Sequence, residues 1–177
     1  MNAAGFTLFL SPEGDGLSRI ERLLNAAARF TGRETARWTC VRTSNGKPFF
    51  VDAPELCFSI SHSGAYWGCA FGLAPVGFDL QRHERCRTAV LARRFFHPAE
   101  AAWLEARGWC NADFFSLWTA KESFLKYTGE GMVNGLDWFN VLAPLPEGAQ
   151  LQHVSGPDGY SLCLCAAPAG AVSVVRL

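Results

Sequence analysis

Three segments of the sequence carry polar side chains where apolar residues would pack better. The first is FSISHS (58–63), a predicted strand that ends in hydroxyl and imidazole groups. The second is VGFDLQ (76–81), in which Asp79 and Gln81 are two residues apart and therefore project from one face of a strand. The third is FFSLWTAKESFLKYTGEG (114–131), predicted as an amphipathic helix that runs into a glycine-punctuated loop. Polar groups at buried positions are costly unless they are paired or bind a ligand.

The predicted helix places Glu122 between the ammonium groups of Lys121 and Lys126. One interpretation is a surface helix on which Glu122 and Lys126 form an ordinary i,i+4 ion pair. The other is a metal site, because Mg²⁺ takes one or two carboxylates when substrate phosphates complete its coordination. Asp79, Gln81 and Glu122 would supply its oxygen ligands. The candidate groups that would neutralise or hold those phosphates are Lys47, His62, Lys121 and Lys126.

This constellation predicts metal-assisted phosphate transfer or phosphate cleavage. The patterns GxxxxGK[ST], GxGxxG, HExxH and GxSxG are absent from the sequence, which disfavours the common nucleotide-binding and hydrolase folds.

Composition narrows the class of protein further. Of the 177 residues, 49% are hydrophobic and 18% are charged, which is typical of a globular chain. The formal net charge of zero argues against a general nucleic-acid binder. No apolar run is long enough to span a bilayer and no basic n-region is present, so we expect no membrane segment and no signal peptide. Seven cysteines without a CxxC pair argue against a zinc site or a disulfide framework, and we expect the reducing cytoplasm.

Periodicity and turn residues predict an α+β chain. The expected helices cover 17–30, 88–96, a segment opening at Pro98 and 114–131, with Glu100 placed to close a capping box. The expected strands are 6–10, 35–42, 56–61, 66–71, 76–81, 136–142, 151–154, 160–165 and 172–177.

A family resemblance covers roughly residues 42 to 142. The segments that carry it are NGKP (45–48), FSISHSGAYWGCAF (58–71), VGFDLQ (76–81), RRFFHPAE (93–100) and FFSLWTAKESFLKYTGEGM (114–132). In order and spacing they resemble the 4′-phosphopantetheinyl transferases, and most of all the larger, pseudo-dimeric type that activates peptide and polyketide synthases.

The resemblance implies a fold of two pseudo-symmetric lobes, each with a small antiparallel sheet and a long helix. We expect an N-terminal α+β lobe over 1–75, a C-terminal α+β lobe with the metal site over 76–177, and coenzyme A in the cleft between them. The implied reaction transfers 4′-phosphopantetheine from coenzyme A to a serine of an acyl- or peptidyl-carrier protein and releases adenosine 3′,5′-bisphosphate.

The resemblance also implies roles for individual residues. Asp79 and Glu122 match the Mg²⁺ ligands, together with Gln81 at a position that is often Glu in the family. Glu122 is further implied as the base for the carrier serine, directly or through a metal-bound water.

Lys121 and Lys126 match lysines near the pyrophosphate, so that Asp79, Lys121 and Glu122 form the expected catalytic set. The remaining groups expected to hold the coenzyme A phosphates are Lys47, Ser61 and His62. Glu100 matches a recurrent acid of the family, but the capping box explains it equally well and it is not assigned to the site.

Two departures from the family pattern affect these expectations. Gln81 removes a potential anionic ligand. Nothing basic precedes Arg19, whereas larger members carry basic residues there that grip the 3′-phosphate; either Arg19 or a neighbour substitutes, or the affinity for coenzyme A is lower. A basic segment is either a solvated helix face or a docking surface for an acidic carrier protein; it contains Arg82, Arg85, Arg87, Arg93 and Arg94.

Two alternatives remain open at this point. One is a Mg²⁺-dependent hydrolase of small phosphoanhydrides. The other is a catalytically weakened module that binds a carrier protein or coenzyme A without transfer.

Overall fold

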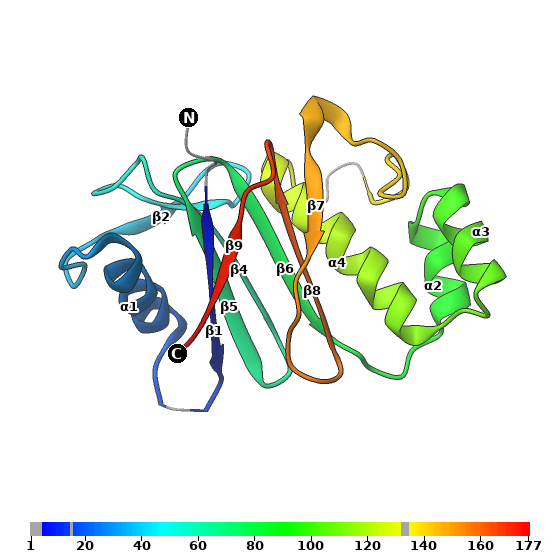
Figure 1. The fold of residues 1–177 in the computed structure, drawn as a ribbon, viewed down its shortest axis with the longest axis horizontal. Coiled ribbons are helices and arrows are strands. Elements are labelled where there is room, and N and C mark those ends of the chain that lie inside the picture. The colour runs from blue at the N-terminus through cyan, green and yellow to red at the C-terminus, as the bar shows by residue number, and fades with distance from the viewer. Residues whose placement is uncertain (1–4, 15, 132–134) are drawn as a thin grey trace.

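The computed structural model describes residues 5–14, 16–131 and 135–177. Its main elements form four layers in the order helix, sheet, sheet, helix, which run from left to right in Figure 1. Helix α1 (Arg19–Thr31) covers the outer face of the first sheet, and α4 (Asn111–Thr128) covers the outer face of the second. The predicted α+β class is confirmed.

The first sheet has the strand order β4-β5-β1-β9. Its strands are β4 (Cys57–Ser63), β5 (Tyr66–Gly72), β1 (Phe6–Pro12) and β9 (Val172–Arg176). The second sheet has the order β6-β8-β7, formed by β6 (Val76–Arg82), β8 (Tyr160–Ala166) and β7 (Gln150–His153). A separate hairpin pairs β2 (Cys40–Arg42) with β3 (Pro48–Phe50). Strands β4 and β6 are therefore end strands of two different sheets.

Three apolar clusters fill the spaces between the layers. Leu23 and Ala27 of α1 pack on Phe58 and Phe71 of the first sheet. The cluster between the two sheets contains Phe6, Leu8, Leu10, Phe78, Leu80, Leu162 and Leu164. The third cluster packs α4 against the second sheet and against two further helices, α2 (Thr88–Phe95) and α3 (Pro98–Ala106). The described chain also contains a short 3₁₀ turn, η1 (Pro146–Gly148).

Local signals set the helix boundaries. Ser18 caps α1, and its side chain and that of Glu21 form a reciprocal capping box. The capping box predicted for Glu100 is confirmed, with His97 as the N-cap residue of α3. Helix α4 ends at Gly129, whose positive φ of 74° suits a residue without a Cβ.

The structure departs from the sequence expectations at four places. Residues 136–142 form bends and turns rather than a strand, and 35–42 is extended only over Cys40–Arg42. The helix predicted to be amphipathic is instead central, with nine buried residues around α4, because sheet and helices cover it on opposite sides; the interpretation as a surface helix is therefore wrong. The first sheet is not purely antiparallel, since β1 and β9 are parallel.

The division into lobes 1–75 and 76–177 stays a prediction. Strand β9 lies at the end of the expected C-terminal lobe but hydrogen-bonds to β1, and so it joins the two parts of the chain within one sheet. No helix of the described residues has the length and apolarity needed to cross a membrane.

Candidate active site

A pocket of about 570 Å³ lies where β4, β6 and α4 meet. Most of the residues predicted from the sequence line it, namely Lys47, Ser61, His62, Asp79, Gln81, Glu122 and Lys126. Apolar walls come from Phe58, Ile60, Trp118 and Leu125. The pocket therefore combines charged groups with an apolar surface, as small-molecule sites usually do.

Asp79 is the most deeply buried acid of this pocket, with 2% of the residue exposed. Its Oδ1 accepts hydrogen bonds from Ser61 Oγ at 2.6 Å and from Lys126 Nζ at 2.7 Å. Its Oδ2 is buried and has no hydrogen-bond partner among the described residues. A buried carboxylate oxygen without a partner is costly, so the unsatisfied Oδ2 requires an explanation.

Glu122 projects from α4 into the same pocket and is half-buried. Burial raises the pKa of Glu122, the nearby Asp79 carboxylate raises it further, and Lys126 opposes both. The two carboxylates are thus close enough to repel each other, which a bound cation would relieve. Within the described ranges no three His, Cys, Asp or Glu residues cluster as metal ligands. Two carboxylates and an amide nevertheless fit Mg²⁺, which keeps waters and takes further oxygens from substrate phosphates.

Gly77 explains how α4 comes so close to β6. A Cβ at this position would lie 1.9 Å from the carbonyl oxygen of Ser123 and 2.4 Å from the amide nitrogen of Tyr127. Gly77 and Asp79 share one face of β6, because side chains alternate along a strand. The close approach permitted by Gly77 therefore places Asp79 against Glu122 and Lys126 of the helix.

Gln81 lines the pocket two residues after Asp79. Its Oε1 accepts a hydrogen bond from Ser63 Oγ at 3.1 Å. The amide oxygen has a second lone pair, so this bond leaves it able to act as a neutral ligand.

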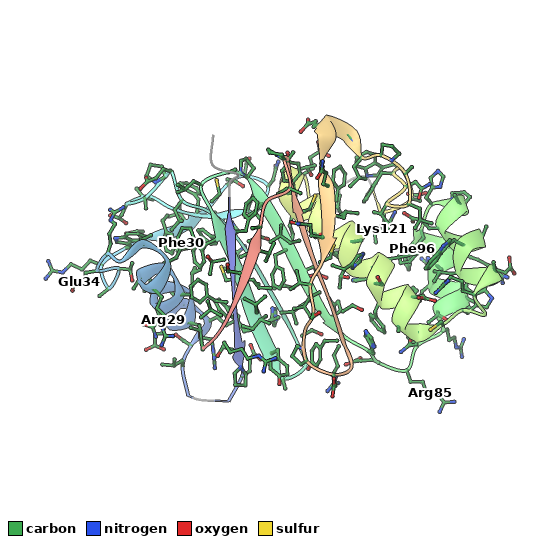
Figure 2. The ribbon with its side chains drawn as sticks, in the orientation of Figure 1. Arg29, Phe30, Glu34, Arg85, Phe96 and Lys121 are labelled. Carbon is green, nitrogen blue, oxygen red and sulfur yellow. The ribbon has the colours of Figure 1, made fainter. Side chains whose placement is uncertain are left out.

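Lys121 is not brought into the pocket, and its assignment near the pyrophosphate is corrected by the structure. Its side chain is 0% exposed, and its Nζ donates to both Glu100 carboxylate oxygens at 2.8 and 2.7 Å and to the Phe139 carbonyl at 2.8 Å. Figure 2 shows Lys121 on the side of α4 that faces Phe96 and the α2–α3 pair. Adjacent helical residues point in directions about 100° apart, so Glu122 can enter the pocket while Lys121 faces away.

Lys47 lines the pocket, but its ammonium group is turned toward the main chain. The Nζ donates to the carbonyls of Tyr127 at 3.0 Å and Val76 at 3.5 Å. Burial lowers the pKa of Lys47. In this arrangement Lys47 ties the turn before β3 to the C-terminal end of α4.

His62 and two arginines form the basic rim of the pocket. His62 is exposed, and its pKa is lowered by partial burial and by the charge of Arg19. Arg19 lines the pocket. Arg42 also lines it, with its Nη1 held by the Gly46 carbonyl at 2.7 Å.

Sequence reasoning missed Arg42 and Trp67. Arg42 ends a short strand just before the NGKP turn, and that position was its only signal. Trp67 lines the pocket, and its buried Nε1 has no partner in the described part of the chain. Its sequence context, YWGCAF, gives no sign of a polar role.

The predicted docking arginines lie outside this pocket. Arg82 pairs with Glu84, and Arg93 pairs with Glu105 while its guanidinium covers the Trp109 ring. Arg85 extends from the edge of the molecule into solvent (Figure 2).

Comparison with known proteins decides the family. The sequence profile of the 4′-phosphopantetheinyl transferase superfamily matches residues 75–167, which include β6, α4 and both candidate carboxylates. A 4′-phosphopantetheinyl transferase of Bacillus subtilis is 33% identical over 158 residues, covering 80% of this chain and 69% of that protein. The chain belongs to the 4′-phosphopantetheinyl transferase superfamily.

Other curated members of the superfamily align over shorter segments. The 4′-phosphopantetheinyl transferase Sfp of Bacillus subtilis (strain 168) is 37% identical over 120 residues, covering 67% of this chain and 52% of Sfp. The 4′-phosphopantetheinyl transferase gsp of Aneurinibacillus migulanus is 42% identical over 89 residues, covering 49% of this chain and 36% of that protein. The match to this chain thus spans only about half of Sfp and about a third of gsp.

Proposed function

We propose that this chain transfers the 4′-phosphopantetheine group of coenzyme A to a serine of an acyl- or peptidyl-carrier protein in a Mg²⁺-dependent reaction. One observation carries the proposal: the buried Asp79, whose Oδ2 has no partner among the described residues, shares a pocket lined by basic groups with Glu122 and raises the pKa of Glu122. The names of the relatives support the same activity.

Asp79 and Glu122 would hold the metal ion, and the Gln81 amide oxygen would complete the protein's share of its ligands. Bound there, Mg²⁺ would neutralise charge on the pyrophosphate. Glu122, at the wall of the pocket, is the group we propose to accept the proton of the carrier serine.

The basic rim is proposed to bind the phosphates of coenzyme A. Arg19, Arg42, His62 and Lys126 all line the pocket and carry N–H groups that can donate to phosphate oxygens. In the reaction the serine Oγ forms a bond to the β-phosphorus, and the bond from that phosphorus to the bridging oxygen breaks. The pair of electrons leaves with adenosine 3′,5′-bisphosphate. Because the chain's groups are already in place, positioning and electrostatics supply most of the rate enhancement.

The carrier protein is proposed to dock on the arginine-rich segment that includes α2. Val90 and Phe95 of α2 are exposed and lie close in sequence to Arg87, Arg93 and Arg94, so this helix offers both apolar and basic side chains. Such a surface suits an acidic helix of a carrier protein. Reversing the charges of Arg87 and Arg94 should raise the KM for the carrier and flatten its salt dependence, with the KM for coenzyme A unchanged.

We place the protein in the cytoplasm as part of this proposal. Its seven cysteines are all free, which suits a reducing compartment.

The decisive experiment is mass spectrometry of a panel of apo-carrier proteins incubated with the enzyme, coenzyme A and Mg²⁺. We expect the mass gain of one phosphopantetheine group, which disappears with a chelator and with Asp79→Asn. Release of nucleotide from coenzyme A without any carrier would indicate a phosphoanhydride hydrolase instead. Co-elution with a carrier that gains no mass would indicate a binding module.

A second measurement tests the phosphate rim. His62→Ala and Arg42→Ala should each raise the KM for coenzyme A several-fold more than the KM for the carrier. Arg33→Ala is the matched control, because Arg33 is an exposed arginine that pairs with Glu55 and does not line this pocket.

A further inference from the structure

Three serines, spaced two residues apart on β4, join the two sheets by hydrogen bonds to β6. Strands β4 and β6 run side by side but belong to different sheets. Ser59, Ser61 and Ser63 lie on one face of β4, because they are spaced two residues apart, and each one contacts β6.

The outer two serines bind the main chain of β6. Ser59 Oγ accepts a hydrogen bond from the amide of Phe78 at 2.9 Å. Ser63 Oγ accepts one from the amide of Arg82 at 3.1 Å. These bonds satisfy two N–H groups of an end strand that would otherwise lack partners, and they fix the position of β6 relative to β4.

The middle serine has a different partner. Ser61 is 6% exposed, and its hydroxyl donates to Asp79 Oδ1 at 2.6 Å. Lys126 Nζ donates to the same oxygen, so that Oδ1 has two donors while Oδ2 has none among the described residues. Both hydrogen-bond donors to the Asp79 carboxylate therefore bind the same oxygen, Oδ1.

We propose that Ser61 is a positioning residue for the metal site: its hydroxyl holds Asp79 by Oδ1 and leaves Oδ2 as the oxygen that binds the cation. This inference rests on the proposed function, which assigns Asp79 as a metal ligand. It gives Ser61 a role different from phosphate binding, because its one hydroxyl proton is committed to Asp79.

The physical reason for needing Ser61 is the freedom of the carboxylate torsion. The χ2 angle of an aspartate is broad, so a carboxylate held by one donor can rotate. Lys126 alone is a weaker restraint, since its side chain is 30% exposed and long. Partners that orient a metal ligand typically contribute ten- to a hundredfold to metal affinity.

The test is direct binding of Mn²⁺, followed by electron paramagnetic resonance, and of Mg²⁺, followed by calorimetry, without coenzyme A. We expect Ser61→Ala to weaken binding of both ions about tenfold. Ser61→Thr keeps the hydroxyl and should restore affinity to within about threefold of the parent. Ser59→Ala is the matched control: it is the same substitution on the same strand face, and it should weaken metal binding much less than Ser61→Ala, because Ser59 binds only the Phe78 main chain and not the Asp79 carboxylate.

Kinetics separate positioning from phosphate binding. At saturating Mg²⁺, Ser61→Ala should leave the KM for coenzyme A within about twofold of the parent and raise the Mg²⁺ concentration needed for half-maximal rate about tenfold. A raised KM for coenzyme A with unchanged metal affinity would overturn the inference. If Ser61→Ala does not fold, Ser61→Cys replaces it, since a thiol is a weak donor of similar size and should weaken metal binding in the same direction.

Asp79→Asn distinguishes failure of this inference from failure of the proposed function. If Asp79→Asn loses metal binding and Ser61→Ala keeps it, only the role of Ser61 is wrong. If Asp79→Asn binds Mn²⁺ and Mg²⁺ as tightly as the parent, the metal assignment of the proposed function fails and the inference fails with it.

Discussion

Helix α4 carries two lysines, each bound to a buried carboxylate at 2.7 Å. The two ion pairs differ in whether every carboxylate oxygen has a hydrogen-bond partner. Lys121 and Glu100 are both fully buried. The Glu100 oxygens also accept from the amides of His97 and Val141, so every charge in this pair has partners. Lys126 and Asp79 lie at the pocket, and one Asp79 oxygen has no partner in the described ranges.

The difference separates a structural ion pair from a binding site. The Glu100–Lys121 pair joins α3, α4 and the segment around Phe139, and it has no oxygen left for a ligand. The Asp79–Lys126 pair is incomplete in the protein alone. A buried polar atom without a partner is rare enough to require an explanation, and the explanation we propose is a cation that binds there together with the substrate.

The largest effect is expected from removing the negative charge of Asp79, the carboxylate of the incomplete pair, or of Glu122, which lines the same pocket. Asp79→Asn and Glu122→Gln should each lower transfer about a thousandfold, as expected when several kcal/mol of metal-dependent stabilisation is lost. Both proteins should stay folded, because Asn and Gln keep the shape of the side chains. Circular dichroism and turnover measured on the same preparations check this, and near-normal turnover of either variant would refute the metal site.

Disrupting the complete pair, Glu100–Lys121, should lower the stability of the protein without changing its dependence on Mg²⁺. Glu100→Gln leaves the Lys121 ammonium buried without a counter-charge, and burial already lowers the pKa of Lys121 against the opposing effect of Glu100. We expect the free energy of unfolding to fall by about 3 kcal/mol, the cost of leaving one buried charge unpaired. Urea denaturation measures this loss.

The double variant Glu100→Gln/Lys121→Met provides the control for that measurement. Because it removes both charges, it should unfold less readily than Glu100→Gln alone. The Mg²⁺ concentration for half-maximal rate should match that of the parent in both variants. A shift in that concentration would mean that the Lys121 pair belongs to the active site after all.

Neither ion pair was predicted as such from the sequence, but the residues of the incomplete pair were both assigned to the candidate site. Asp79, Glu122 and Lys126 belong to local patterns whose spacing predicts which face of a strand or helix they share. The burial of Lys121 depends on Glu100, 21 residues earlier, and on a main-chain carbonyl of Phe139 in a segment expected to be a strand. That segment cannot complete a strand ladder at Val141, whose amide donates to Glu100.

Long-range pairing limited the fold prediction in the same way. The segments of β1 and β9 were both predicted as strands, but nothing local indicates that they pair in parallel across the whole chain. Gly77 shows a second limit of prediction from local sequence. A glycine within a strand suggests close approach of another backbone, but only the structure identifies α4 as its partner.

Lys47 allows the comparison to be extended to a third lysine. Its ammonium binds two carbonyls, one of them at the C-terminal end of α4, where a positive charge is favourable. Lys47→Met should therefore reduce the free energy of unfolding by about 1.5 kcal/mol. The KM for coenzyme A should stay within twofold of the parent if Lys47 behaves as a structural lysine. A several-fold rise in that KM, with unchanged stability, would instead assign Lys47 to the phosphates, as the family resemblance implies.

The smallest expected effect comes from adding a charge to the incomplete site. Gln81→Glu keeps an oxygen that can accept from Ser63 Oγ, and it places a third carboxylate near Asp79 and Glu122. Without metal the added repulsion should lower stability slightly; with metal the extra anionic ligand should lower the Mg²⁺ concentration for half-maximal rate about threefold.

A Mg²⁺ titration of the parent, Gln81→Glu and Gln81→Ala at fixed coenzyme A measures this effect, and the rise in melting temperature with Mg²⁺ provides a second readout. Gln81→Ala should need only slightly more Mg²⁺ than the parent, because a water can replace a neutral amide oxygen. If Gln81→Glu needs more Mg²⁺ than the parent, residue 81 does not face the cation. The cation would then lie nearer to α4 than to the end of β6, and Glu122 rather than Asp79 would be its principal ligand.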